Sequence, residues 1–282
     1  MDKNKQQTIN SGLYLVSTPI GNMEDITLRA INILKKSNII LCEDTRRSGK
    51  LLSYFQIKSK LMPYHKFNEK KISDKVINII KENKIVSLIS DAGTPTISDP
   101  GKILVNRCID ENINIHPIPG PSAAVSALSV SGFNDQYLFY GFLPKKINEL
   151  DKVLKKLSNL DYPIIFFSPS IKIDFYISKF KKYFFDRKIL IGKEMTKIHE
   201  EFIRKNVLVN NNLTKNLKGE ITIVLSNKTK GKNLKKEINE SVKIEIKKML
   251  KKYSHKDVVE FISKKENLSK KLIYEYCLKV KK

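Results

Sequence analysis

The sequence lacks several features that would place it in common classes of protein. No apolar run approaches the length of a membrane span, and the opening MDKNKQQTIN has no apolar core of a signal peptide. Metal-binding spacings are also absent: no two cysteines form C-x-x-C, and the histidines form no H-E-x-x-H. The residues concerned are Cys42, Cys108, Cys277, His65, His116, His199 and His255. We therefore expect a cytoplasmic protein without a disulfide framework or a metal site.

Arginine is scarce in a chain that is otherwise strongly basic. Only six of the 53 basic residues are arginine, and the net charge is +24. Abundant Lys, Ile and Asn are what an AT-rich genome imposes, so the total charge alone is weak evidence for a polyanionic partner. The charge rises along the chain, from +5 in residues 1–143 to +8 in 144–226 and +11 in 227–282. This gradient favours a surface near the C-terminus that faces RNA.

Apolar runs and helical patterns alternate through the first half of the chain. This alternation predicts an α/β domain over 1–141, with a mostly parallel sheet that is covered on both faces. The expected strands are Leu13–Ser17, Asn38–Cys42, Leu61–Tyr64, Ile85–Ile89, Asn114–Ile118 and Gln136–Gly141. Helices are expected around Leu28–Leu34, Ile72–Ile80, Ile103–Ile109 and Ala123–Val130.

The rest of the chain divides into a second α/β domain, 142–226, and a basic C-terminal region, 227–282. In the second domain the patterns predict strands near Pro163–Phe167, Lys188–Glu194, Glu201–Lys205 and Glu220–Leu225, and helices near Leu150–Leu157 and Ile171–Tyr183. A lysine-rich linker, Asn227–Asn239, precedes helical patterns at Ser241–Tyr253, Lys256–Lys265 and Ser269–Val280.

Three predicted strands end in loops rich in glycine, proline and hydroxyl residues. Ser90–Gly101 reads S-D-A-G-T-P-T-I-S-D-P-G, and it follows the fourth strand. Ser17–Asn22 follows the first strand and Pro119–Ala123 the fifth. Open α/β sheets bind ligands at the carboxyl ends of their strands, so we expect a small-molecule site here. Neither G-x-G-x-x-G nor G-x-x-x-x-G-K-[ST] is present, and dinucleotide and P-loop sites therefore lack their fingerprints.

Two further loops carry candidate catalytic side chains. Glu43 and Asp44 stand beside Arg46 and Arg47 after the second strand, and His65 follows the third. Arginine can grip a phosphate with two hydrogen bonds, which lysine cannot do. Alternatively, Asp44 and Arg46 pair with each other and shape the loop, and His65 is structural.

These motifs resemble the bacterial 16S rRNA (cytidine-2′-O)-methyltransferase I family of the tetrapyrrole methylase superfamily. The resemblance rests on L-Y-L-V-S-T-P-I-G-N (13–22), E-D-T-R (43–46), the Ser90–Gly101 signature and P-G-P-S-A (119–123), with E-M-T-K (194–197), E-E-F (200–202) and K-G-E (218–220) in the second half. One segment departs from the family. Where relatives carry a Y-E-S-P-H-R-like segment, this chain has Ile171 and Lys172 in place of the histidine and arginine, so roles in the 168–172 segment cannot be transferred.

The resemblance implies an α/β, two-domain tetrapyrrole-methylase-like (class III methyltransferase) fold with a C-terminal helical extension. It implies S-adenosyl-L-methionine as cofactor, bound by Pro19, Gly21, Asp91, Ala92, Gly93, Thr94, Gly120, Pro121, Ser122, Ala123, Phe142 and Leu143. The implied partner is 16S rRNA in the small ribosomal subunit, contacted by Arg29, Arg46 and Arg47, and the protein is expected to be a homodimer.

The implied reaction is 2′-O-methylation of a decoding-centre cytidine. A ribose 2′-hydroxyl needs a base, for which Glu43, Asp44 and His65 remain open candidates. Two other functions are alternatives: methylation of a tetrapyrrole or corrinoid intermediate, and non-catalytic RNA binding on the ribosome.

Overall fold

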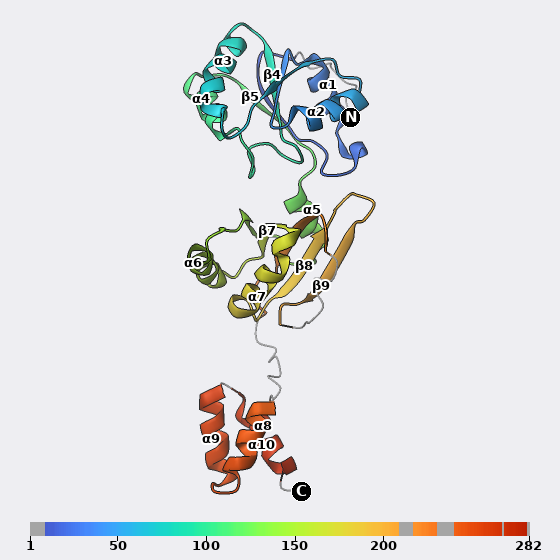
Figure 1. The fold of residues 1–282 in the computed structure, drawn as a ribbon. Coiled ribbons are helices and arrows are strands. Elements are labelled where there is room, and N and C mark those ends of the chain that lie inside the picture. Colours follow the sequence, from blue (N-terminus) through green and yellow to red (C-terminus); the bar gives the residue numbers. More distant parts are fainter. Residues whose placement is uncertain (1–8, 209–216, 230–239, 267, 281–282) are drawn as a thin grey trace. The chain divides into compact units, whose positions relative to one another are not determined.

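The computed structural model describes residues 9–208, 217–229, 240–266 and 268–280. The chain forms two compact units, Met1–Lys228 and Thr229–Lys282 (Figure 1). The boundary expected from the sequence, between residues 226 and 227, lies two residues before this division. Among the described residues, no helix combines the length and apolar character that crossing a membrane requires.

The first sheet is entirely parallel and has the order β3-β2-β4-β1-β5. Its strands are β1 (Gly12–Val16), β2 (Ile39–Cys42), β3 (Lys60–Pro63), β4 (Ile85–Ile89) and β5 (Ile115–Ile118). The chain connects them through η1 (Met23–Asp25), α1 (Leu28–Lys36), α2 (Thr45–Tyr54), α3 (Glu69–Lys81) and α4 (Lys102–Asp110). All five strands overlap the ranges expected from the sequence.

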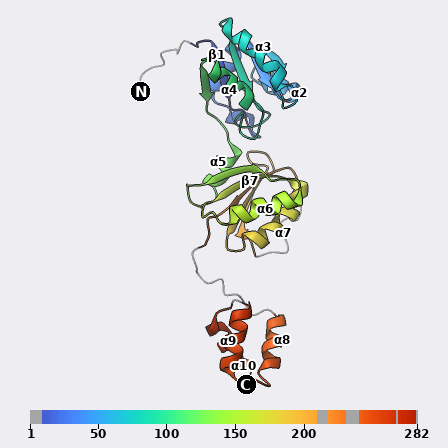
Figure 2. The same ribbon diagram turned by 90° about the vertical axis from the view of Figure 1, so that its left-hand side faces the viewer.

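The two faces of this sheet carry separate apolar cores, because successive residues of a strand point to opposite faces. Tyr14 and Ile40 pack among the buried residues of α1 and α2. Leu13 and Leu41, their neighbours in sequence, pack among those of α3 and α4. Helices therefore cover both faces, as the alternating pattern predicts (Figures 1 and 2).

Two expectations for the first half are wrong. The polar stretch Thr45–Tyr54 forms α2, whereas we expected a loop after the second strand. The strand expected at Gln136–Gly141 is β6 (Leu138–Phe142), and it pairs with β7 of the second sheet instead of extending the first. The break between the sheets thus lies before β6, and the division expected at 141/142 falls inside that strand, one residue before its end.

The second sheet is mixed and has the order β6-β7-β10-β8-β9. Its other strands are β7 (Ile164–Pro169), β8 (Lys188–Lys193), β9 (Glu201–Asn206) and β10 (Glu220–Leu225). β6 runs parallel to β7, and the remaining pairs are antiparallel. One face packs on α6 (Ile147–Ser158) and α7 (Ile173–Tyr183), which follows the short η2 (Ser170–Lys172). α5 (Ala123–Ser129) covers the other face.

Because α5 directly follows β5 of the first sheet, it links the two halves of the larger unit. Its Ala124 and Ala127 pack against Ile165, Leu190 and Val224 of the second sheet. These small side chains let the helix approach the strands closely. The start of α5 is thereby held at the point where the chain leaves one sheet for the other.

One arginine is buried in the second half. Arg187 is 1 % exposed, and its guanidinium donates to the carbonyls of Tyr162 and Ser226 at 2.8 Å each and to that of Leu160. It also lies over the ring of Phe184, 5.1 Å from the centroid. The arginine therefore satisfies several carbonyls near the end of the larger unit, a task that suits its planar set of donors.

The smaller unit is built from α8 (Glu240–Met249), α9 (His255–Glu266) and α10 (Lys270–Val280). Its apolar core includes Ile246, Val258, Ile262, Ile273 and Cys277. Helices were expected in all three places. Most of the predicted linker, residues 230–239, lies outside the described residues.

Candidate functional site

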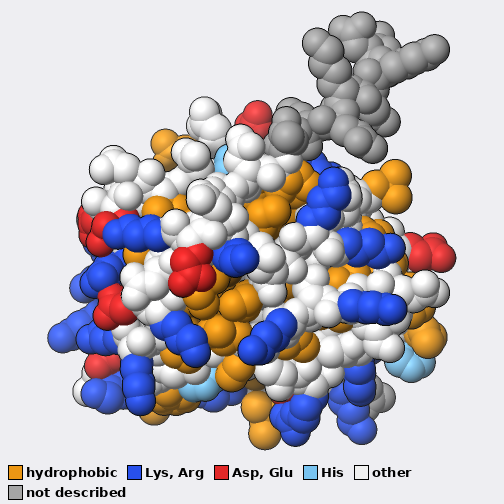
Figure 3. Space-filling view, turned by 90° about the horizontal axis from the view of Figure 1, so that it is seen from above, with side chains coloured by type: hydrophobic (Ala, Val, Ile, Leu, Met, Phe, Trp, Pro, Cys, Tyr) orange, Lys and Arg blue, Asp and Glu red, His pale blue; other side chains and the backbone are white. Residues whose placement is uncertain are grey.

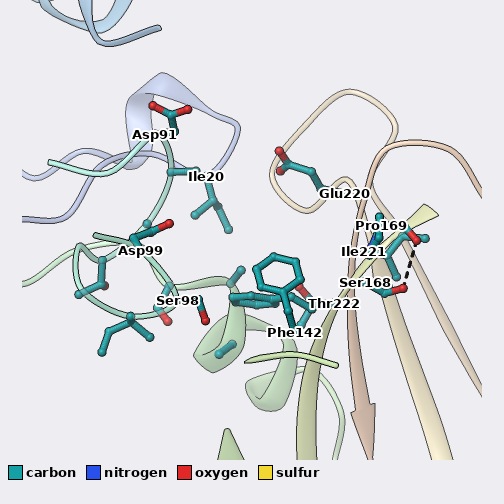
Figure 4. Close-up of a pocket in the computed structure, with 18 of the residues that line it drawn as sticks. Ile20, Asp91, Ser98, Asp99, Phe142, Ser168, Pro169, Glu220, Ile221 and Thr222 are labelled. Carbon is teal, nitrogen blue, oxygen red and sulfur yellow. Dashed lines mark hydrogen bonds between the residues drawn. The ribbon is translucent and has the colours of Figure 1, made fainter. Parts of the chain in front are cut away.

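A cavity of about 550 Å³ opens where the strand-end loops of the first sheet face the second sheet. This volume lies within the usual range for sites of small molecules. Residues from both halves of the larger unit line it: Ile20, Glu43, Arg47, Asp91–Thr94, Ile97–Asp99, Ser122–Ala124, Phe142, Phe167–Ser170 and Gly219–Thr222. In Figure 4, Asp91 and Asp99 lie on one side of the cavity and Ser168 and Glu220 on the other.

The first side of the cavity is acidic. Glu43, Asp91 and Asp99 all line it, and Glu43 and Asp91 are close enough to affect the titration of Asp99. Burial, reinforced by these two negative charges, raises the pKa of Asp99 from 3.8 to about 6. The cavity is therefore suited to a ligand that carries positive charge.

The Ser90–Gly101 loop owes its shape to residues with left-handed backbone. Gly93 has φ of +79°, and its N–H and carbonyl pair with those of Thr18 at 3.0 and 2.9 Å. Thr96 and Ser98 also have positive φ, at 72° and 68°. Such strained positions are common where a loop is shaped for binding. The pairing joins this loop to the loop after β1, as the common edge of the parallel strands predicts.

Asp44 performs a structural task at the start of α2. Its carboxylate accepts the backbone N–H of Arg46 at 2.8 Å and is held by Nε and Nη2 of the same arginine at 3.1 and 2.8 Å. These hydrogen bonds hold the pKa of Asp44 well below its usual range. The structure therefore agrees with the alternative in which Asp44 and Arg46 pair and shape the loop.

Arg47, the next residue of α2, reaches the cavity. Its Nη1 lies 3.4 Å from Oδ2 of Asp91, and the arginine lines the cavity together with Glu43. The backbone N–H of Asp44 donates to Oδ1 of Asp91 at 3.3 Å. The start of α2 is thus attached to the Ser90–Gly101 loop through Asp91.

Seven of the twelve predicted cofactor residues line the cavity, and the other five do not: Pro19, Gly21, Gly120, Pro121 and Leu143. Asp91, Ala92, Gly93, Thr94, Ser122, Ala123 and Phe142 line it. Pro19 lines a smaller neighbouring cavity, and the carbonyl of Pro121 accepts from Thr94 Oγ1 at 3.4 Å. Gly120 lies against Ser17, where a Cβ would come within 2.9 Å of the serine side chain. Leu143 is buried in the core of the second half.

His65 and Arg29 are not among the residues that line this cavity. The backbone N–H of His65 donates to Asn68 Oδ1 at 2.8 Å, and its ring meets that of Phe67 edge-on at 6.1 Å. Arg29 is exposed on α1 and lowers the pKa of Tyr14 by its charge, against the larger raising effect of burial. Of the three candidate bases, Glu43 is the one that lines the cavity.

Several residues that line the cavity were not among the predicted site residues. Ile97, Ser98 and Asp99 were inside the recognised signature, and only their roles were missed. Gly219 and Glu220 belong to the quoted K-G-E block. Ser168 and Ser170 fall in the segment that departs from the family pattern, so the altered 168–172 stretch contributes to the cavity wall.

A tight turn after β8 connects the two halves near this wall. Glu194 accepts the N–H of Glu220 at 2.7 Å and lies 3.0 Å from Lys197 Nζ. Thr196 Oγ1 accepts the N–H of Asn22 in the loop after β1, at 3.0 Å. Gly219 lacks a side chain where the carboxylate of Glu194 passes, since a Cβ would lie 2.3 Å from its Oε1. These contacts fix the loop of one half against the strand of the other.

The basic side chains form no single patch on the face of the molecule seen in Figure 3. Lysine and arginine side chains are scattered over it among apolar and uncharged groups. The scatter agrees with a lysine content that reflects overall composition as well as function.

Comparison with known proteins identifies the class of protein to which the chain belongs. Residues 12–208 match the model of the tetrapyrrole (corrin/porphyrin) methylases, so the chain belongs to that class. It resembles the solved uroporphyrin-III C-methyltransferase from Thermus thermophilus (TM-score 0.55, 17% identity, 77% of this chain and 94% of that one). It also resembles the methyltransferase CobJ (TM-score 0.59, 14% identity, 78% and 97%). At these identities the likeness concerns the fold alone.

Sequence relatives define the family within the class. The chain is 42% identical over 281 residues to ribosomal RNA small subunit methyltransferase I of Rickettsia prowazekii (strain Madrid E), covering 97% of this chain and 98% of the relative. The enzymes of that name from Thermotoga maritima (42%; 77% and 98%) and Bacillus subtilis strain 168 (41%; 69% and 67%) are also similar. The chain belongs to the ribosomal RNA small subunit methyltransferase I family, and the resemblance noted in the sequence is confirmed.

Proposed function

We propose that this protein uses S-adenosylmethionine to methylate the ribose 2′-hydroxyl of a decoding-centre cytidine in 16S rRNA. The observation that carries the proposal is the acidic cavity between the two halves, in a chain that belongs to a family of rRNA methyltransferases. A solved structure of the same fold, of uroporphyrin-III C-methyltransferase from Thermus thermophilus, is a complex with S-adenosyl homocysteine (TM-score 0.52, 14% identity).

The residues of the cavity fit this cofactor. S-adenosylmethionine carries positive charge at its sulfonium and its amino group, and Asp91, Asp99 and Glu43 offer negative charge. Burial and the negative charges of Glu43 and Asp91 raise the pKa of Asp99, and a cationic ligand would offset the cost of ionising this carboxyl. Phe142, 59 % exposed at the cavity, offers an apolar surface, with its ring edge-on to Phe167 at 5.5 Å.

Bound in this way, the cofactor supplies an electrophilic methyl group on a sulfonium. The largest contribution of the protein is then alignment, because the attacking oxygen and the methyl group must lie in line. The Gly93–Thr18 pairing joins two loops on the first side of the cavity, and the Asn22–Thr196 hydrogen bond attaches that side to the second half. Glu43 is the carboxylate we assign to accept the proton of the 2′-hydroxyl, since it lines the cavity and Asp44 is occupied by Arg46.

The RNA contacts that we propose come from two regions. Arg47 lies beside the cavity, and Arg29 and Arg46 are exposed on the same half of the protein. The C-terminal unit adds Lys247, Lys248, Lys251 and Lys252 at the end of α8 and in the following turn. Such contacts to phosphates position an RNA without reading its sequence.

Sequence identity favours ribosomal RNA over a tetrapyrrole as substrate. The rRNA-methylating relatives are about 42% identical, whereas the solved tetrapyrrole methylases are 17% identical or less. The test is to supply S-adenosylmethionine with small ribosomal subunits or with precorrins and to map 2′-O-methyl groups by mass spectrometry. Methylation of a corrin carbon, or tight RNA binding without cofactor binding by calorimetry, would support one of the other two functions.

We also propose that the protein acts in the cytoplasm, where ribosomal subunits assemble, and that it forms a homodimer. Apolar side chains of α5 and of the segment that connects it to β6 are available for a second copy: Val125 is 52 %, Val130 37 % and Tyr137 42 % exposed. Two-fold dimers use self-complementary faces of this kind. Sedimentation should show a dimer at micromolar concentration, and a monomer there would contradict this part.

A further inference from the structure

A second, smaller cavity lies beside the first and shares two of its residues. Its volume is about 220 Å³, and both Arg47 and Asp91 line the two cavities. The other residues that line it are Thr18, Pro19, Met23, Ser48, Lys50, Leu51 and Ser90. A ligand in this cavity would therefore lie next to whatever occupies the first.

The cations of this cavity come from α2. Arg47 and Lys50 are three residues apart in sequence, which places them on the same side of the helix. Arg47 contacts Asp91 through Nη1 alone, at 3.4 Å, so most of its five donors remain available. Lys50 is exposed and forms no ion pair with any residue that the structure describes. With Asp91 counted, the cavity keeps one net positive charge.

The other residues that line the smaller cavity leave the N–H groups of Arg47 and Lys50 available to a ligand. The hydroxyl of Thr18 donates to the carbonyl of Ser90 at 3.0 Å, and that of Ser90 donates to the carbonyl of Gly93 at 3.1 Å. These protons are used within the protein. Pro19, Met23 and Leu51 supply an apolar wall. A ligand that fits this cavity is thus an anion that also presents C–H groups to the apolar wall. A phosphodiester and the sugar attached to it have this character.

We infer that the smaller cavity binds a backbone phosphate of the RNA strand, next to the nucleotide that is methylated, through Arg47 and Lys50. This inference rests on the proposed function. It assigns to Lys50 a role in holding the strand so that the target ribose enters the larger cavity. Arg46 does not line this smaller cavity, and its Nε and Nη2 are bound to Asp44.

The experiment uses Lys50→Ala in the full chain, because Lys50 lines only the smaller cavity. Lys75→Ala, an exposed lysine on α3 that lines neither cavity, is the matched control. Methylation of small ribosomal subunits is measured over a series of salt concentrations, and cofactor affinity by calorimetry. For Lys50→Ala we expect KM for the subunit to rise about five- to tenfold and the slope of log affinity on log salt to fall by about one.

The cofactor affinity and thermal stability of Lys50→Ala should match those of the wild type. Lys50→Arg, which keeps the positive charge, should have a KM close to that of the wild type. An unchanged KM and salt slope in Lys50→Ala, or an equal change in Lys75→Ala, would overturn the inference. A loss of cofactor affinity would overturn it too, because Lys50 would then belong to the cofactor site. If the wild type itself methylates no ribosomal subunit, the proposed function fails instead, and the two failures are distinguishable.

Discussion

Replacement of Asp99 by asparagine should change the stability of the protein and its affinity for the cofactor in opposite directions. The substitution keeps the shape of the side chain and removes its charge. Burial, Glu43 and Asp91 raise the pKa of Asp99 from 3.8 to about 6, so the ionised form is disfavoured in the free protein. A charge that is costly without ligand and favourable with a cationic ligand is expected of a binding group, and a purely structural carboxylate would lack this combination.

The effect on stability follows from the direction of the pKa shift. Between about pH 4 and pH 6 the folded protein binds more protons at this position than the unfolded chain, so stability falls as pH rises through that window. Above pH 6, the ionised Asp99 lowers the free energy of unfolding by its full amount, at most about 3 kcal/mol for a shift of this size. Asp99→Asn should therefore raise the free energy of unfolding of the ligand-free protein at about pH 7.5.

The same substitution should weaken cofactor binding, although it stabilises the ligand-free protein. If the bound cation returns the pKa of Asp99 to its ordinary 3.8, wild-type affinity should fall about tenfold between about pH 7.5 and pH 5. The asparagine variant loses a charge-assisted contact and should bind ten- to a hundredfold more weakly at about pH 7.5, with a flatter pH profile. Calorimetric titrations and denaturant unfolding at both pH values measure these quantities.

Two outcomes would refute this reasoning. If the variant is less stable than the wild type at neutral pH, the carboxylate is not held against its preference for water. If its cofactor affinity and pH profile match the wild type, Asp99 does not face the cation.

Four further predictions concern other parts of the protein. Gly93→Val places a β-branched residue at φ of +79° and should abolish cofactor binding while the protein stays folded; calorimetric binding at wild-type strength would contradict this. Glu43→Gln should lower the single-turnover methylation rate about a hundredfold with stability unchanged, whereas Asp44→Asn should mainly lower the melting temperature; the reverse pattern would exchange their roles. Removal of 229–282 should weaken binding to small subunits and flatten its salt dependence at constant cofactor affinity, and an unchanged slope would mean that these lysines reflect composition only. Thr196→Val removes the acceptor of the Asn22 N–H and should raise the cofactor Kd severalfold with little change in unfolding, and an unaltered Kd would show that the hydrogen bond does not fix the cavity.

The sequence predicted the elements whose residues pack in a regular pattern. β4 and β10 have the bounds expected from their apolar runs, Ile85–Ile89 and Glu220–Leu225. α2 was missed because T-R-R-S-G-K begins with polar residues, and its buried Leu51 and Leu52 come only near the end. The place of β6 was wrong because an apolar run gives no information about which sheet the strand joins.

The candidate site shows the same limit. The Ser90–Gly101 loop was recognisable because its glycines, prolines and aspartates are local in sequence. The contribution of Gly219–Thr222 was not, since it depends on how the second sheet faces the first. The role of Asp44 could be stated only as an alternative, because capping and catalysis use the same carboxylate and only coordinates show where Arg46 lies.

The strand order of the second sheet has a consequence for how the chain acquires its structure. β10 lies between β7 and β8 and pairs with both, yet it is the last of the five strands in sequence. During synthesis, the first sheet can assemble once β5 has emerged, whereas β7 and β8 each keep an unpaired edge until Leu225 is available. Exposed edges of this kind recruit other chains and promote aggregation. Pairing of the central strand is therefore the step that closes the sheet, and a chain interrupted before Glu220 should accumulate as an aggregation-prone intermediate with a folded first sheet.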